Sequence, residues 1–305
     1  MADRVPVGGG ASEGFVVLAN QAAGSVQERS LGDAVRELAQ HGPTELHMTS
    51  GADDLDRELR DLGNRRPVVV GGDGSLHLAV NRMRVLGLSD VPVGLVPLGT
   101  GNDLARGLRL SLDPAEAARV VATGRAQPLP VATHDGSAEV VVNNVHTGLG
   151  ERAARLGTGL KPRLGALAYP AGALLAGARP DVATVEVRVD GRSVHQGPAL
   201  AVVVALGPSA GGGHEVAPGA DPTEPQLDVV LVAASSLRAR LSVGAAIMAG
   251  RDPAERPGVH RWSGRRIEIV HGGAVTPPWD LDGEIRRWSS PVGLTVEPAA
   301  WWLVR

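Results

Sequence analysis

Residues 68–76 read VVVGGDGSL, and this stretch decides the fold that we expect for the first part of the chain. Three β-branched residues predict a short buried strand, and the glycines after them lead into a helix that begins near Leu76. Glycines at such a junction let an anion approach the backbone, and the free N–H groups of a helix start attract negative charge. Taken alone, the stretch fits equally well a tight turn that needs glycine for steric reasons.

A second stretch of the same kind follows about 25 residues later, where residues 96–106 read VPLGTGNDLAR. It too follows a strand pattern and opens a helix pattern. Two neighbouring strands that both end in glycine loops place the loops at the carboxyl edge of a sheet, where α/β proteins bind ligands. Asn102 and Asp103 are candidates either for contacting a bound nucleotide or for capping the helix.

Working outward from these loops, strand and helix patterns alternate over the first 125 residues. Ser30 is placed to cap the first helix, and Asp113 with Pro114 begins the last one. Strands that alternate with helices predict a parallel sheet covered on both faces, hence an α/β domain. The expected strands are 15–19, 45–48, 68–70 and 91–96.

Strand patterns dominate after about residue 126, which predicts a second, mainly antiparallel β domain. Asp190-Gly191 is a strong hairpin signal, residues 164–175 and 237–248 are helical, and 207–213 and 250–258 resemble mobile loops. The expected strands are 139–143, 182–189, 199–205, 227–232 and 266–270. We therefore expect domains at 1–126 and 127–290, with residues from about 290 to 305 as a candidate for return to the first domain.

The composition of the chain excludes several kinds of site and argues against several kinds of partner. The chain has no cysteine, which excludes disulfides, thiolate metal sites and a cysteine nucleophile. A net charge of −3 and an aromatic content of 2% argue against nucleic acid as a partner. The longest clean apolar run, residues 199–206, is shorter than the roughly 20 residues that cross a bilayer. No signal peptide pattern is present at the start, so a cytoplasmic protein is expected.

Several nucleotide-binding motifs are also absent. The sequence has no G-x-x-x-x-G-K-[ST] of the P-loop proteins and no G-x-G-x-x-G at the start of the first helix. The protein-kinase H-R-D and D-F-G sets are missing as well. If the glycine loops bind phosphate, they therefore do so in a site of another kind.

A third candidate lies late in the chain, where residues 279–284 read WDLDGE. Asp282-Gly283 by itself is a hairpin turn signal. If the backbone is extended, however, Asp282 and Glu284 share one face and can hold Mg²⁺ or take a proton from a hydroxyl. Asp73 repels phosphate within its glycine loop, so it suits a magnesium ligand near a reacting phosphate.

The two glycine stretches together resemble the diacylglycerol kinase catalytic domain. That superfamily includes bacterial diacylglycerol kinases, lipid kinases of the phosphatidylglycerol type, sphingosine and ceramide kinases and, more remotely, NAD kinases. The second stretch favours the lipid branch over the NAD kinases. Other segments are similar to further motifs of the family: 20–24, 143–148, 211–228 and 282–284.

The resemblance implies an α/β domain with a Rossmann-like parallel sheet, followed by a β-sandwich, with a nucleotide bound between them. It implies that Asp73 lies against the phosphates and Mg²⁺, that Asp282 is the general base, and that Glu284 assists it. It also implies a structural magnesium site near Glu224, although Pro225 stands where the family has glycine. The residues implied for ATP binding are Asn20, Thr49, Gly71, Gly72, Gly74, Ser75, Gly99, Thr100, Gly101, Asn102 and Asp103.

Two positions depart from the family's opening motif, since Gln21 replaces its proline and Ala23 its serine. The function implied is an ATP-dependent lipid kinase, most directly one that converts diacylglycerol to phosphatidic acid. A sphingoid base, ceramide, phosphatidylglycerol or NAD is an alternative acceptor. A non-catalytic nucleotide-binding regulatory protein is an alternative of another class, and the retained acidic residues argue against it.

A membrane lipid substrate implies a peripheral protein at the inner face of the membrane, and bacterial relatives suggest a homodimer. A basic cluster beside the apolar residues 164–175 is the candidate membrane contact, and a solvated helix face is the simpler alternative. The cluster comprises Arg152, Arg155, Lys161 and Arg163. We expect Trp301 and Trp302 to pack internally rather than anchor at a membrane, and His146 and His214 to be ordinary polar residues.

Overall fold

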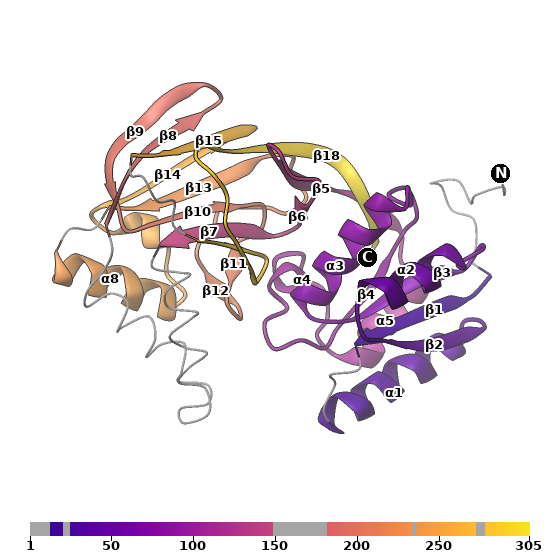
Figure 1. Cartoon of the computed structure of the whole chain (residues 1–305). Helices are drawn as coiled ribbons and strands as arrows, with labels where there is room; N and C mark the ends of the chain where they lie inside the picture. Colours follow the sequence, from indigo (N-terminus) through magenta and orange to yellow (C-terminus); the bar gives the residue numbers. More distant parts are fainter. Residues whose placement is uncertain (1–12, 21–24, 149–181, 234–235, 273–277) are drawn as a thin grey trace. The chain divides into compact units, whose positions relative to one another are not determined.

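The computed structural model describes residues 13–20, 25–148, 182–233, 236–272 and 278–305, and it divides the chain into two compact units. The first unit comprises Met1–Val131 together with Pro298–Arg305, and the second comprises Ala132–Glu297. The chain crosses between the units twice, within strand β5 (Ala126–His134) and within strand β18 (Val292–Val304) (Figure 1).

The first unit contains a parallel sheet in the order β2-β1-β3-β4, as the alternating pattern predicts. Its strands are β1 (Phe15–Asn20), β2 (Thr44–Thr49), β3 (Arg66–Gly71) and β4 (Gly94–Pro97). Its helices are α1 (Ser25–Ala39), α2 (Ala52–Arg60), α3 (Asp73–Val85), α4 (Asp103–Gly107) and α5 (Pro114–Thr123). The expected α/β class is thereby confirmed.

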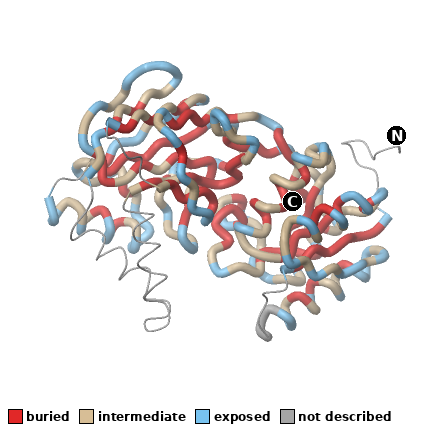
Figure 2. Tube along the Cα trace, in the orientation of Figure 1, coloured by how far each residue is buried: buried red, intermediate tan, exposed pale blue. Residues whose placement is uncertain are grey.

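Alternate residues of the central strands face opposite sides of this sheet, and both sets are buried (Figure 2). Val17 and Val68 pack with Leu38 of α1 and Val121 of α5 in one apolar cluster. Since burying such a side chain contributes about 1.5–3 kcal/mol, this cluster accounts for much of the unit's stability.

Of the two helix starts that the sequence indicated, one is confirmed and the other is wrong. Asp113 caps α5 as expected, because its side chain accepts a hydrogen bond from the Glu116 N–H. Ser30 does not cap α1, because that helix already begins at Ser25 and Ser30 lies within it. The apolar stripe on which the prediction was based starts only at Leu31, one turn or more after the true helix start.

The end of β18 belongs to the first unit. The Val93 N–H donates to the Trp302 carbonyl, and the Val304 N–H donates to the Val93 carbonyl. Trp301 is buried, and its indole N–H donates to the Pro130 carbonyl at 3.3 Å. The internal packing expected for Trp301 is therefore confirmed, whereas Trp302 is half-buried.

The second unit is a β-sandwich of two six-stranded sheets, ordered β6-β5-β18-β15-β8-β9 and β14-β13-β10-β7-β16-β17. Neighbouring strands whose register is defined run antiparallel, as predicted. One apolar cluster joins Val187 and Ile269 of one sheet to Val229 and Leu281 of the other. Besides β5 and β18, the strands of these two sheets are β6 (Val140–Val141), β7 (Asn144–Gly148), β8 (Ala183–Val189), β9 (Arg192–Ala199), β10 (Ala201–Ala205), β13 (Leu227–Val232), β14 (Val259–Gly264), β15 (Arg266–His271), β16 (Trp279–Leu281) and β17 (Glu284–Arg286).

Smaller elements complete the second unit: the two-stranded pair β11 (Ser209–Ala210) and β12 (His214–Glu215), helix α8 (Leu237–Met248) and the short helix η2 (Pro253–Glu255). Asp190 and Gly191 join β8 to β9 with φ values of 50° and 80°, which confirms the predicted hairpin and fits a type I′ turn. Helix α8 has the bounds that the apolar pattern predicts.

Other expectations for this unit were wrong or incomplete. The strand expected at 139–143 is interrupted, because β6 ends at Val141 and β7 begins at Asn144. The 13-residue strand β18 and the strand β14 were not predicted. The segments 207–213 and 250–258 contain the short elements β11 and η2 rather than loop alone. The helix expected at 164–175 lies outside the described residues.

A buried histidine should make the second unit sensitive to acid. The His271 ring stands edge-on to Trp279, with 5.7 Å between ring centroids, and neither ring nitrogen has a hydrogen-bond partner among the described residues. Burial lowers the pKa of His271 below its usual value of about 6.5. Between the lowered pKa and about 6.5, His271 binds a proton in the unfolded chain but not in the folded chain, so acid favours unfolding.

We therefore expect the free energy of unfolding to fall as the pH drops below about 6.5, by at most about 1.4 kcal/mol per pH unit for this one group. The loss should cease once the pH is below the lowered pKa of the folded state. Denaturant titrations across this range measure it. His271→Phe keeps the ring contact and should flatten the slope. Equal slopes for His271→Phe and the wild type would contradict the assignment.

Candidate active site

The predicted nucleotide residues of the first unit gather at one edge of its sheet. Asn20, the last residue of β1, pairs in register with Thr49, the last residue of β2. Gly71 at the end of β3 pairs with Pro97 at the end of β4. Because the four strands are parallel, all these ends and both glycine loops share the carboxyl edge. The Thr49 hydroxyl donates to the Ala19 carbonyl at 3.3 Å.

The two glycine loops touch backbone to backbone. A Cβ atom built on Gly99 would lie 2.4 Å from the Cα atom of Gly72, and one built on Gly72 would lie 2.9 Å from the Cα atom of Gly99. Both distances are well below the roughly 3.5–4.0 Å of a favourable carbon contact. Glycine is thus required at both positions for steric reasons alone.

Gly74 is different, because no atom lies within 4 Å of the place where its Cβ atom would be. Gly74 is exposed at the start of α3, where alanine would favour the helix by up to about 1 kcal/mol. Packing within the chain therefore gives no reason for a glycine here. A ligand that approaches the backbone at the helix start does give one.

Asp73 connects the first loop to the second. It is the first residue of α3, and its Oδ1 atom accepts a hydrogen bond from the Leu104 N–H at 3.1 Å. Leu104 lies in the first turn of α4, so the carboxylate stands at the positive ends of two helices. This explains an acidic residue inside a loop of anion-binding type. Ser75 lies beside Gly71, because a Cβ atom on Gly71 would be 2.5 Å from its hydroxyl oxygen.

Asn102 closes the second loop on itself. Its backbone is left-handed with φ 54°, its Oδ1 atom accepts from the Gly99 N–H at 2.9 Å, and its Nδ2 atom donates to the Gly99 carbonyl at 2.8 Å. The side chain makes no cap hydrogen bond to α4, so the capping role considered for it is wrong. The buried amide instead fixes the shape of the loop.

The rest of this loop is more open. Thr100 is exposed, and the Gly101 carbonyl accepts from the exposed Arg106 side chain at 3.0 Å. Asp103 is buried as the first residue of α4. Arg106, which the sequence reasoning left without a role, thus adds a cation beside the loop.

The acidic motif of the second unit has a different backbone from the one predicted. Asp282 and Gly283 have φ values of 49° and 96° and form the turn between β16 and β17. The side chains of Asp282 and Glu284 therefore do not share one face of an extended strand. Asp282 is 7% exposed and points inward, whereas Glu284 is exposed.

The Asp282 carboxylate accepts three backbone hydrogen bonds. Its Oδ2 atom accepts from Val142 at 2.8 Å, and its Oδ1 atom accepts from Asn143 at 3.0 Å and Asn144 at 2.8 Å. Three consecutive N–H groups cannot point one way in a regular strand, in which they alternate. This is the physical reason for the interruption between β6 and β7.

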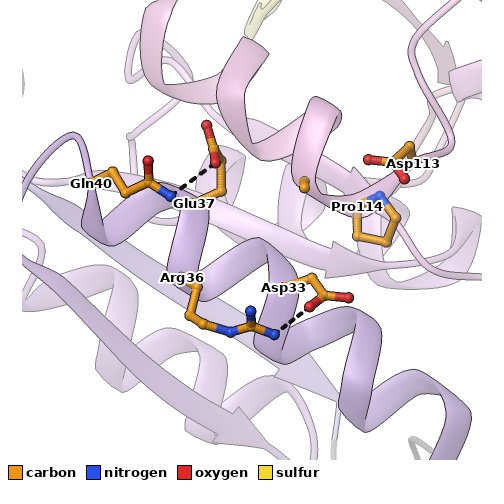
Figure 3. Close-up of a pocket in the computed structure, with 7 residues that line it drawn as sticks. Asp33, Arg36, Glu37, Gln40, Asp113 and Pro114 are labelled. Atoms are coloured by element: carbon orange, nitrogen blue, oxygen red, sulfur yellow. Dashed lines mark hydrogen bonds and ion pairs between the residues drawn. The ribbon is translucent and has the colours of Figure 1, made fainter.

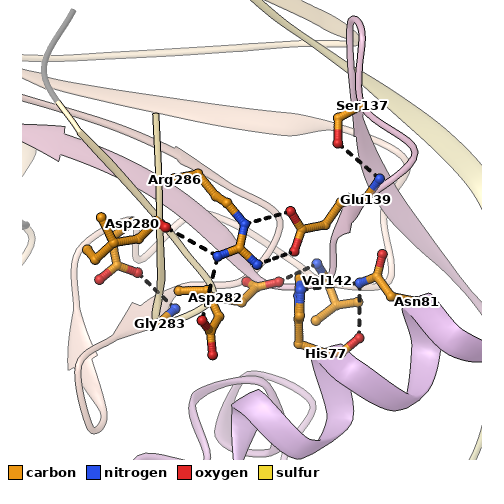
Figure 4. A network of polar contacts seen from close by, with 11 residues as sticks. His77, Asn81, Ser137, Glu139, Val142, Asp280, Asp282, Gly283 and Arg286 are labelled. Carbon is orange, nitrogen blue, oxygen red and sulfur yellow. Dashed lines mark hydrogen bonds and ion pairs between the residues drawn. The ribbon is translucent and has the colours of Figure 1, made fainter. Parts of the chain in front are cut away.

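Polar groups surround this turn (Figure 4). Asp280 is 7% exposed, accepts from the Gly283 N–H at 2.8 Å, and has its Oδ1 atom 4.0 Å from His146 Nε2. Arg286 forms a bidentate ion pair with Glu139, with contacts of 2.9 and 2.7 Å. Glu139 raises the pKa of Arg286 further. Sequence reasoning missed Asp280, although it is two residues from Asp282 and its burial follows from the neighbouring apolar residues.

Behind the turn, Asn143 and Asn144 both donate from their side-chain amides to the Ser209 carbonyl, at 3.0 and 3.2 Å. The Oδ1 atom of Asn143 is buried and has no hydrogen-bond partner among the described residues. This segment of the second unit therefore presents a carboxylate held by the backbone, a second buried acid and an unsatisfied amide oxygen.

Two family models cover most of the chain. The model described as "Diacylglycerol kinase catalytic domain" matches residues 14–134, and "YegS C-terminal NAD kinase beta sandwich-like domain" matches residues 143–305. The chain belongs to the diacylglycerol kinase family. The resemblance of the glycine loops is thereby confirmed, and with it a kinase whose acceptor is an alcohol group.

Individual members of the family resemble the chain along most of its length. A "Probable lipid kinase YegS-like" of Cronobacter sakazakii is 28% identical over 85% of this chain and 86% of its own. The diacylglycerol kinase of Bacillus subtilis is 28% identical over 73% of this chain and 74% of its own. The crystal structure of a diacylglycerol kinase from Bacillus anthracis superposes with a TM-score of 0.76 at 20% identity, over 97% of this chain and 98% of that one.

The structural magnesium site that the resemblance implies near Glu224 stays a prediction. Glu224 is exposed, and the nearby Asp221 carboxylate accepts from the N–H and the hydroxyl of Thr223. Across the described residues, no group of three or more His, Asp or Glu side chains gathers, although a magnesium ion held by one carboxylate and backbone carbonyls does not need such a group.

A separate pocket of about 180 Å³ lies between α1 and the start of α5 (Figure 3). Its lining includes Asp33, Glu37 and Asp113, and most of these groups are already paired within their own helices. Its lining contains no residue of the two glycine loops.

The structure does not test the membrane contact that the basic cluster suggests, because Arg152, Arg155, Lys161 and Arg163 lie outside the described residues. Gln21 and Ala23, where the chain departs from the family's opening motif, lie outside them as well. Among the helices that the structure describes, none is long and apolar enough to cross a membrane.

Proposed function

We propose that this kinase transfers the γ-phosphate of MgATP to the hydroxyl group of diacylglycerol and forms phosphatidic acid. The observation that carries the proposal is the pair of glycine loops at the carboxyl edge of the first unit's sheet, with open space at Gly74, where packing gives no reason for a glycine. Membership of the diacylglycerol kinase family supports phosphoryl transfer as the reaction.

In this proposal the triphosphate lies along the edge formed by the two loops, and the nucleoside lies toward the ends of β1 and β2. The N–H groups at the starts of α3 and α4 neutralise phosphate charge. The residues assigned to the nucleotide are Asn20, Thr49, Gly71, Gly72, Gly74, Ser75, Gly99, Thr100, Gly101 and Asp103, with Asn102 shaping the loop.

Mg²⁺ enters with the nucleotide as part of the substrate. Magnesium is usually bound through one or two carboxylates together with substrate phosphates, and it keeps several of its waters. The Asp73 carboxylate is a donor of this kind at the loops, and we assign it to the metal side of the phosphates. Glu224 lies outside the transfer step proposed here, and its structural magnesium site stays a separate prediction.

During transfer, a bond forms between the lipid hydroxyl oxygen and the γ-phosphorus, and the bond from that phosphorus to the β–γ bridging oxygen breaks. ADP leaves with the bridging oxygen's charge, and the hydroxyl proton passes to a base. We assign that base to Asp282, with Asp280 as the neighbouring acid of the same turn. Glu284 is exposed and is assigned only an electrostatic contribution at the edge of the turn.

The acceptor is identified by incubating the protein with labelled ATP, Mg²⁺ and a total lipid extract, followed by identification of the labelled product. Labelled phosphatidic acid is the expected result. Label in a sphingoid base, ceramide or phosphatidylglycerol product would reassign the acceptor. Label only in NADP, or ATP binding with no transfer, would contradict a lipid kinase.

A further inference from the structure

Helix α8 carries two apolar faces, and only one of them packs against other residues that the structure describes. Ala239, Val243 and Ile247 pack on Val230 and Val232 of strand β13. This contact explains why all six residues of β13 are buried, since one face of the strand meets the sandwich core and the other meets the helix. The inward side of α8 thus packs against the sandwich.

The outward side of α8 is apolar as well. Leu237, Leu241 and Met248 are 51%, 46% and 49% exposed, which places them among the most exposed large apolar residues described. At 3.6 residues per turn, the three fall within an arc of about 40° and form a stripe about 17 Å long. Gly244 and Ala245, both exposed, fill the stripe between them without polar groups.

Cations flank this stripe. Arg238 and Arg240 project to either side of the Leu237–Leu241 line, and Arg251 follows the end of the helix. Residues 236–251 contain these three arginines and no aspartate or glutamate, although the whole chain has a net charge of −3. The helix therefore presents an apolar strip between positive charges, a pattern that suits an anionic lipid surface.

We propose that α8 docks this kinase on an anionic lipid bilayer, with its axis in the plane of the interface and the stripe defined by Leu237, Leu241 and Met248 in the acyl boundary. The arginines then lie at the level of the lipid headgroups, with their apolar stems along the helix. The proposal deepens the function given above and rests on it, because a lipid acceptor must be taken from such a surface.

A second copy of the chain fits this surface less well. In a twofold dimer the same patch meets itself, so the arginines that flank one stripe would lie near those of the other. A stripe one helix wide is also small against the roughly 1,200 Å² that a stable interface buries. Charge and size therefore favour the lipid surface.

The test compares wild type with Leu237→Gln/Leu241→Gln by sedimentation with phosphatidylcholine vesicles, with and without phosphatidylglycerol, in the absence of nucleotide. Each lost leucine should weaken binding at least about tenfold. Arg238→Gln/Arg240→Gln should weaken binding to anionic vesicles by about fivefold per charge and leave neutral vesicles unchanged. Val85→Gln in α3 and Arg192→Gln in β9 are matched controls at exposed positions of the two units.

Phosphate transfer to detergent-dispersed diacylglycerol is measured in parallel, and it should be equal in wild type and the α8 variants. Vesicle binding by the leucine variant as tight as that of wild type would overturn the docking role. Failure of the wild type to bind anionic vesicles would also overturn the docking role. If that wild type still phosphorylates dispersed lipid, the proposed function is kept without the docking role. A variant that changes from dimer to monomer with unchanged vesicle binding would assign α8 to self-association and overturn the proposal.

Discussion

Gly99→Ala is expected to lower the affinity for ATP and the kcat/KM for phosphate transfer by at least about 100-fold. The added methyl carbon would lie 2.4 Å from the Gly72 Cα atom and 2.8 Å from the Asn102 Oδ1 atom. Neither neighbour is the flexible end of a long side chain, so the loops must separate by about 1 Å to admit it. A displacement of that size in a positioning group can cost about 10²-fold in rate.

Two other glycines make this result interpretable. Gly32→Ala lies in α1, away from the loops, with no atom within 4 Å of its Cβ position, and it should leave activity unchanged and stabilise the helix by up to about 1 kcal/mol. Gly74→Ala should likewise stabilise its helix by up to about 1 kcal/mol but weaken ATP binding, because its methyl group fills the space assigned to phosphate.

Isothermal titration with ATP and steady-state kinetics measure both effects, and thermal unfolding shows whether the fold is intact. An ATP affinity of Gly99→Ala within a few-fold of wild type would refute the phosphate assignment of the loops. Gly74→Ala with wild-type affinity would move the phosphates away from the α3 start.

The first unit was predictable because its signals are local. A run such as Val68–Val70 and the glycines after it specify a buried strand and its exit within nine residues. The parallel order then brings both loops to one edge by topology alone. The interlocking of Gly72 with Gly99 was not predictable, because it depends on the spacing of two strands rather than on either loop.

The second unit was harder because its decisive contacts are long-range. The backbone of Asp282 is set by a carboxylate that binds Val142, Asn143 and Asn144, about 140 residues away. Read locally, Asp282-Gly283 already indicated the turn that the positive φ values show, and the error was the extended alternative that put Asp282 and Glu284 on one face. The contact of Asp282 with residues 142–144 also interrupts the strand expected at 139–143, and no local pattern indicated that contact.

Asp282→Asn is the second substitution with a large expected effect. Removing a general base typically costs about 10² to 10⁴ in rate. The structure adds a cost in stability, because the asparagine NH₂ group would face a backbone N–H where a carboxylate oxygen now accepts. Leaving a buried donor unsatisfied costs about 1–3 kcal/mol. We therefore expect a variant that still binds ATP, unfolds more easily, and has lost at least 100-fold in kcat.

Matched variants distinguish the loss of a general base from a loss of structure at this turn. Glu284→Gln changes an exposed residue and should alter stability by no more than about 0.5 kcal/mol. Asp280→Asn keeps the three hydrogen bonds of Asp282 and tests the neighbouring acid. A loss of kcat at Asp282→Asn with unchanged KM for ATP supports the base, since the loops are then intact. Equal falls in stability and ATP affinity, or a greater loss of kcat at Asp280→Asn, would instead make Asp282 a positioning residue that holds residues 142–144 in place.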